Sequence, residues 1–133
     1  MPFYGYGAKM PPFRTTVSHC FAVNGNIFAP EIRGVHEVMR CYTRCLEEIK
    51  FHGPSGLAPI IEFCCNIASE REVTQDNQFY FIIVIFSNGR ISDPEATIDA
   101  LVAMSFLPVS VVFVGIAGDI PEGEGEEWAP DFS

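Results

Sequence analysis

The sequence predicts one α/β domain built on a doubly wound, mostly parallel sheet. Two apolar runs, residues 79–86 and 109–114, lack the polar alternation of half-exposed strands, which is typical of strands buried on both faces of a parallel sheet. A helical pattern separates them, and this order implies a right-handed crossover between neighbouring parallel strands. At 133 residues the chain has the length of a single domain and can bury about two-thirds of its unfolded surface.

The first third of the chain contains shorter strand candidates. Residues 3–6 form a short aromatic strand, in which the neighbouring glycines allow close backbone approach. Residues 9–16 contain two consecutive prolines and are predicted to be a loop. Residues 17–23 alternate loosely between apolar and polar, which favours an outer strand.

Three helices are predicted from apolar spacing and start signals. Residues 31–50 carry apolar side chains at intervals of three and four, namely Val35, Val38, Met39, Tyr42, Cys45, Leu46 and Ile49. Residues 58–72 are apolar around most of the helix, so we expect this helix to be well covered. The third helix begins with Asp93 as N-cap and Pro94 at the first helical position, and we expect it to bury Ile98, Leu101 and Val102.

The negative charge is concentrated at the C-terminal end. The formal net charge is −9, and six of the nine charges belong to residues 119–133, which contain no Lys or Arg. We therefore assign residues 1–118 to the domain and residues 119–133 to an acidic, disordered tail. Neither part carries a basic stripe, so we expect no nucleic-acid binding and no direct membrane binding by this chain.

The cysteines and the N-terminus indicate the compartment. An odd number of cysteines with mainly apolar neighbours, together with an N-terminus that lacks the pattern of a secretory signal, favours free thiols and a cytoplasmic location. No zinc-type spacing links the five, which are Cys20, Cys41, Cys45, Cys64 and Cys65. The three histidines, His19, His36 and His52, are scattered, and we interpret them as ordinary surface or loop residues.

Two loops are candidates for a binding site, because ligands of open α/β sheets bind at the carboxyl ends of the strands. One contains Ser55 and the other contains Asn88, Gly89 and Arg90. Ser55 is one residue short of a Gly-x-Ser-x-Gly nucleophile elbow and follows a helix instead of a strand. A small serine hydrolase that uses Ser55 is therefore an alternative function, but the residues predict no enzyme and no catalytic residues.

Several segments together resemble the C-terminal domain of the copine family, a relative of the von Willebrand factor A domain. They are Phe-Tyr-Gly-Tyr-Gly-Ala at 3–8, Pro-Pro at 11–12, Val-Ser-His at 17–19, Phe-Ala-Val-Asn at 21–24, Gly-Pro-Ser at 53–55, Tyr-Phe-Ile-Ile-Val-Ile at 80–85, Ile-Ser-Asp at 91–93 and Leu-Pro-Val-Ser at 107–110. They occur in the family's order over residues 2 to 117. The resemblance implies a Rossmann-like sheet with helices on both faces and a metal-ion-dependent adhesion site at its carboxyl edge.

The implied metal site is degenerate in this chain. In the family an Asp-x-Ser-x-Ser motif, a Thr and an Asp provide oxygen ligands to Mg²⁺, Mn²⁺ or Ca²⁺. These 133 residues contain no counterpart of that first motif, Ser55 stands for the Thr, and Asn88 stands for the Asp and lacks its charge. We expect no cofactor, with weak Mg²⁺ or Ca²⁺ binding through Ser55 and Asn88 as the alternative. The family's lipid-binding C2 domains also have no counterpart, so calcium-dependent membrane binding is not carried over.

The residues and the resemblance together predict a truncated, copine-type module that binds a protein partner. Arg90 adds a positive charge beside Ser55, Asn88 and Gly89, so we expect these residues to bind an acidic group of the partner, through Arg90 and backbone amides. The alternative function is a divalent-cation-dependent adhesion module, with Asp93 or a partner completing the metal ligands.

The family's first strand, which lies at the centre of the sheet, also has no counterpart here. Its absence leaves the apolar strand at residues 79–86 with an unpaired edge. We expect either direct pairing between residues 3–7 and 79–86, or a strand from another chain, or a partial product that folds poorly. The open edge also allows self-association.

Overall fold

The strands are divided among three small sheets instead of forming one. A computed structural model describes residues 1–12, 15–52 and 55–116. In the N-terminal half, β1 (Tyr4–Gly5) pairs antiparallel with β4 (Phe21–Ala22), and β2 (Ala8–Lys9) lies antiparallel between β3 (Val17–Ser18) and β5 (Lys50–Phe51). In the C-terminal half, β6 (Phe81–Ser87) pairs parallel with β7 (Val109–Gly115).

The α/β class and the parallel crossover are confirmed in the C-terminal half. The register joins Phe81 to Val109 and Ser87 to Gly115, and α3 (Pro94–Met104) connects the two strands. α2 (Ala58–Ser69) packs beside α3, and both helices contribute to a core with β6. This core consists of Leu57, Ile61, Ile85, Ala100 and Met104.

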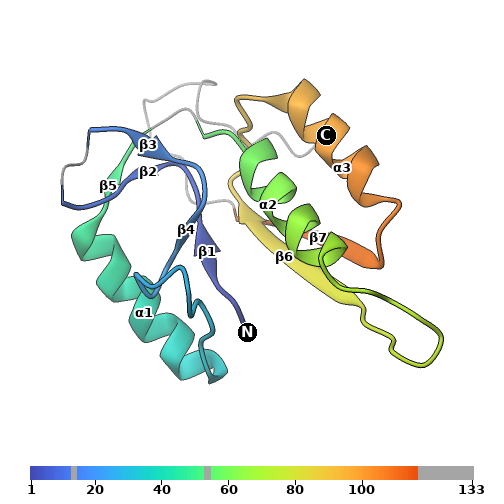
Figure 1. The fold of residues 1–133 in the computed structure, drawn as a ribbon. Coiled ribbons are helices and arrows are strands. Elements are labelled where there is room, and N and C mark those ends of the chain that lie inside the picture. Colours follow the sequence, from blue (N-terminus) through green and yellow to red (C-terminus); the bar gives the residue numbers. More distant parts are fainter. Residues whose placement is uncertain (13–14, 53–54, 117–133) are drawn as a thin grey trace.

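The expectation that residues 79–86 are buried on both faces is wrong. Ile82, Val84 and Phe86 are 69%, 48% and 54% exposed, whereas Ile85 on the opposite face is 7% exposed. The physical reason is that α2 and α3 share one face of the β6–β7 pair, while α1 (Gly34–Glu48) lies with the N-terminal strands (Figure 1). Helices on both faces of one mostly parallel sheet are therefore not what the described residues form.

The N-terminal half has a second, smaller core. It consists of Ala8, Phe21, Val23 and Cys45, so α1 contributes one buried side chain. Other apolar residues of its expected face are exposed, such as Val35 at 69% and Met39 at 58%. The spacing correctly predicted a helix, but short two-residue strands cover only part of an apolar face that is fifteen residues long.

Two further expectations about elements need correction. The predicted strand over residues 17–23 is broken into β3 and β4, with His19 and Cys20 between them. In α3 the buried residues are Thr97, Ala100 and Met104, whereas Ile98 and Val102 are exposed. The buried face of α3 therefore lies elsewhere on the helix than the apolar residues alone predict.

The β1 and β6 strands do not pair with each other, so the expectation that they close up is wrong for this structure. None of the helices in the described ranges is long and apolar enough to cross a membrane. The predicted acidic tail, residues 119–133, lies outside the described residues.

Candidate functional site

The loop after β6 is a tight turn held by its own side chains. The Gly89 amide donates to Ser87 Oγ at 3.1 Å, and the Arg90 amide donates to Asn88 Oδ1 at 3.2 Å. Gly89 has a φ of +83°, a conformation that favours glycine. The backbone amides of Gly89 and Arg90 are therefore already used within the loop.

Ser55 lies against Gly7, in the turn between β1 and β2. A Cβ atom on Gly7 would overlap Ser55 Oγ, and Gly7 has a φ of +75°. The Ser55 carbonyl accepts a hydrogen bond from the Ser92 amide at 3.1 Å, which ties this loop to the segment before α3. Glycine at position 7 is thus required for both its backbone conformation and the space that Ser55 occupies.

The structure brings three of the predicted site residues together. Ser55, Asn88 and Arg90 line one pocket of about 380 Å³, whereas Gly89 supports the turn without lining it. The rest of the lining is largely apolar or aromatic and comes from β1, β4, α1 and the end of β6. Arg90 is the only charged side chain among the described residues that line this pocket.

The start of α2, next to Ser55, uses a carboxylate from far along the chain. Asp93 accepts hydrogen bonds from the Leu57 and Ala58 amides at 2.8 and 3.0 Å, and from Thr97 Oγ1 at 3.2 Å. Burial alone would raise the pKa of the Asp93 carboxyl, but these hydrogen bonds outweigh it and hold that pKa below its usual value. Asp93 is the N-cap residue of α3, as predicted, but its side chain caps α2.

The side chain of His19 contacts the start of α2, which the sequence did not predict. Its Nδ1 accepts a hydrogen bond from the Gly56 amide at 3.3 Å, so the imidazole joins the β3–β4 turn to the start of α2. No periodic signal marks such a contact, because it joins positions far apart in the chain. Within the described residues, no hydrogen bond joins Ser55 Oγ to His19 or Asp93, so the nucleophile–base pair that a hydrolase requires is not formed.

The donor set around this pocket fits a divalent cation poorly. Mg²⁺ and Ca²⁺ prefer several carboxylate and carbonyl oxygens. The Asn88 side-chain oxygen is used by the Arg90 amide, and the Asp93 carboxylate is used by the first turn of α2. In the part of the chain that the structure describes, no group of three or more His, Cys, Asp or Glu side chains could hold a metal ion.

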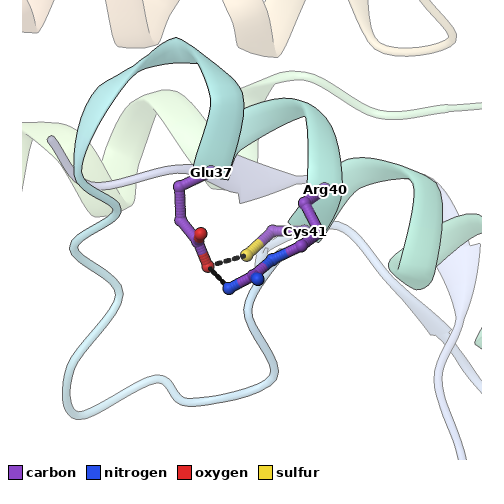
Figure 2. A network of polar contacts seen from close by, with 3 residues as sticks. All are labelled: Glu37, Arg40 and Cys41. Carbon is purple, nitrogen blue, oxygen red and sulfur yellow. Dashed lines mark hydrogen bonds and ion pairs between the residues drawn. The ribbon is translucent and has the colours of Figure 1, made fainter.

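A separate polar network lies on α1 (Figure 2). Glu37 forms an ion pair of 2.6 Å with Arg40, and the Cys41 thiol lies 3.8 Å from the same carboxylate oxygen. The hydrogen bond to Glu37 raises the pKa of the Arg40 guanidinium. Because the Arg40 side chain is 77% exposed, this pair contributes little to stability and forms no enclosed site.

Comparison with known proteins decides the family. A family model described as "Copine" matches residues 1–124. The chain belongs to the copine family. It is 40% identical over 116 residues to "Copine-A" of Dictyostelium discoideum and 37% identical over 117 residues to "Protein BONZAI 1" of Arabidopsis thaliana.

These matches cover most of this copine chain but little of its relatives. They include 87% and 88% of the chain, whereas the chain spans 19% and 20% of the length of the two relatives. The copine resemblance inferred from sequence is therefore confirmed, and family membership supports a protein-interaction module of the copine type. The activities of the much longer relatives are not transferred to this chain.

Proposed function

We propose that this chain is a non-catalytic interaction module that binds an acidic group of a protein partner without a metal ion. The observation that carries this proposal is the position of Arg90, the only charged side chain among the described residues that line the pocket of Ser55 and Asn88. Arg90 is exposed beside largely apolar walls, so its charge attracts an anion to this pocket most strongly at low salt concentration.

The chemistry of the lining indicates the kind of partner. An arginine guanidinium can bind a carboxylate through two parallel hydrogen bonds. The Ser55 hydroxyl and the Asn88 amide nitrogen are further donors at the same pocket. Since the surrounding walls are aromatic and aliphatic, the best ligand is an acidic side chain flanked by aromatic residues.

The test uses a fluorescently labelled hexapeptide that contains two Asp and two Phe residues. We expect Arg90→Ala to weaken its binding about tenfold or more, and Arg90→Lys to weaken it less, because lysine keeps the charge but loses the two-point geometry. Arg71→Ala is the matched control: it removes the same charge from a side chain that lies over the Phe79 ring at 4.9 Å and does not line the pocket. Equal affinities of Arg90→Ala and Arg71→Ala would refute the proposal.

Metal independence is tested separately by thermal unfolding. A ligand that binds only the native state raises the unfolding midpoint by mass action. We expect millimolar Mg²⁺ or Ca²⁺ to leave the midpoint of the wild-type chain unchanged, because the carboxylate and amide oxygens nearby are used by the backbone. An upward shift of the wild-type midpoint that Asn88→Asp increases would instead favour the divalent-cation-dependent module.

The proposal that the module is non-catalytic has its own measurement. The Ser55 hydroxyl lacks a hydrogen-bonded base among the described residues, so we expect no turnover of generic p-nitrophenyl esters above the rate with Ser55→Ala. Turnover by the wild-type chain that is lost in Ser55→Ala would support the hydrolase alternative.

A further inference from the structure

Among the asparagines of this sequence, only Asn24 and Asn88 directly precede a glycine. An Asn-Gly pair can react with itself, because the backbone nitrogen of the glycine can attack the side-chain carbonyl carbon of the asparagine. Glycine carries no side chain that hinders this approach. Asn24 follows β4, whereas Asn88 follows β6. The structure therefore allows a comparison between two chemically equivalent pairs in different surroundings.

Hydrogen bonds hold the groups that would react at Asn24. The Gly25 amide, which would be the attacking group, donates to the Ala22 carbonyl at 2.9 Å. The Asn24 side-chain nitrogen, which would leave as ammonia, donates to the Ala29 carbonyl at 2.7 Å. Both of these hydrogen bonds must break before the pair can react, so the folded structure slows the reaction at this position.

The corresponding groups at Asn88 are held by fewer contacts. The Gly89 amide donates to Ser87 Oγ at 3.1 Å, and within the described ranges no hydrogen bond holds the Asn88 side-chain nitrogen. Asn88 is exposed, so water reaches its side chain. Its Oδ1 accepts from the Arg90 amide, as Asn24 Oδ1 accepts from a backbone amide two residues later, so the charge that develops on this oxygen is stabilised at both positions.

We propose that Asn88 is a modification site at which the chain converts its own asparagine into aspartate and isoaspartate. The Gly89 nitrogen loses its proton to water or hydroxide and bonds to Asn88 Cγ. The bond between Cγ and Nδ2 breaks, and Nδ2 takes protons from water and leaves as ammonia. Water then opens the five-membered imide. Cleavage between the Gly89 nitrogen and Cγ gives aspartate, and cleavage between that nitrogen and the main-chain carbonyl carbon gives isoaspartate.

The conversion changes the charge of the pocket that Asn88 and Arg90 line. Arg90 is the only charged side chain among the described residues of this lining. A carboxylate at position 88 keeps an oxygen acceptor for the Arg90 amide and adds a negative charge close to the guanidinium. It attracts the guanidinium and repels an acidic ligand. This effect on ligand binding rests on the proposed function, whereas the conversion itself does not.

The first experiment follows the conversion by peptide mass spectrometry while the full chain is incubated in neutral buffer. We expect Asn88 to convert at least about fivefold faster than Asn24, which is the factor that one typical hydrogen bond contributes. In urea the two rates should become similar, because the hydrogen bonds at both positions are lost. Equal rates in the folded chain, faster conversion of Asn24, or a ratio that urea leaves unchanged would overturn the proposal.

The second experiment measures binding of the labelled acidic hexapeptide, with EDTA present so that no divalent cation bridges two carboxylates. Asn88→Asp is expected to bind about tenfold or more weakly than fresh wild type. Asn88→Gln is the matched control, because it keeps an amide but cannot close a five-membered ring, and its affinity should not change during incubation. Conversion of the wild-type chain without loss of affinity would overturn the effect on the ligand. A fresh wild-type chain that does not bind would refute the proposed function and this effect together, while the rates at Asn88 and Asn24 decide the conversion independently.

Discussion

The carboxylate of Asp93 joins the start of α3 to the start of α2, and its removal tests how much this contact stabilises the fold. Asp93→Ala removes two hydrogen bonds to the α2 amides of Leu57 and Ala58, and one from Thr97. Loss of a helix cap costs about 1 kcal/mol, and hydrogen bonds to a charged group contribute about 1.5–3 kcal/mol. We therefore expect Asp93→Ala to lower the free energy of unfolding by about 2 kcal/mol, and Asp93→Asn by about half as much, because the amide keeps one acceptor oxygen.

The stabilisation by Asp93 depends on pH, and the direction of that dependence follows from its lowered pKa. The folded-state pKa of Asp93 is lowered, so the ionised carboxylate stabilises the folded chain fully above the unfolded-state pKa of about 3.9. That contribution is lost as the pH falls through the lowered folded-state pKa. The difference between wild type and Asp93→Ala should therefore be constant from neutral pH down to about pH 5 and shrink in more acidic solution.

The assay is urea unfolding followed by circular dichroism at pH 7, 5 and 3, with Asp99→Ala as control. Asp99 is an exposed carboxylate of the same helix, so its removal changes the net charge equally without removing the cap. Equal free energies of unfolding for Asp93→Ala and Asp99→Ala at pH 7 would refute the capping role. A difference between wild type and Asp93→Ala that does not change with pH would refute the assignment of the effect to the ionised carboxylate.

The remaining predictions concern the core, a glycine and a thiol. Leu57→Ala should cost about 3 kcal/mol in urea unfolding, because Leu57 is 1% exposed in the larger core. Gly7→Ala should destabilise more than Gly25→Ala in the same assay, since both have positive φ but only the Cβ at position 7 meets Ser55 Oγ. Burial raises the pKa of the Cys64 thiol to about 11, so iodoacetamide at pH 8 should modify it roughly a hundredfold more slowly in the folded chain than in urea, measured by peptide mass spectrometry.

The candidate site shows how far sequence reasoning reaches. Ser55 and Arg90 were selected because both loops were expected at the carboxyl edge of one sheet; they line one pocket, although β5 and β6, the strands before them, belong to different sheets. That these residues bind a ligand stays a prediction. The capping role of Asp93 and the contact of His19 could not be predicted, because each joins positions more than thirty residues apart. Local spacing carries no information about such pairs.

For the fold, the sequence by itself determined the three helices, the two long strands and the family, whereas the short strands β2 and β5 were not predicted. The helices α1, α2 and α3 and the strands β6 and β7 all lie close to their predicted ranges, because apolar periodicity and start signals act within a few residues. Only the tertiary structure decided which faces are covered: β6 has the composition of a strand buried on both faces, yet Ile82 is 69% exposed. Burial depends on which other elements reach a face, and here α2 and α3 lie on one side of β6 while α1 packs against the short N-terminal strands.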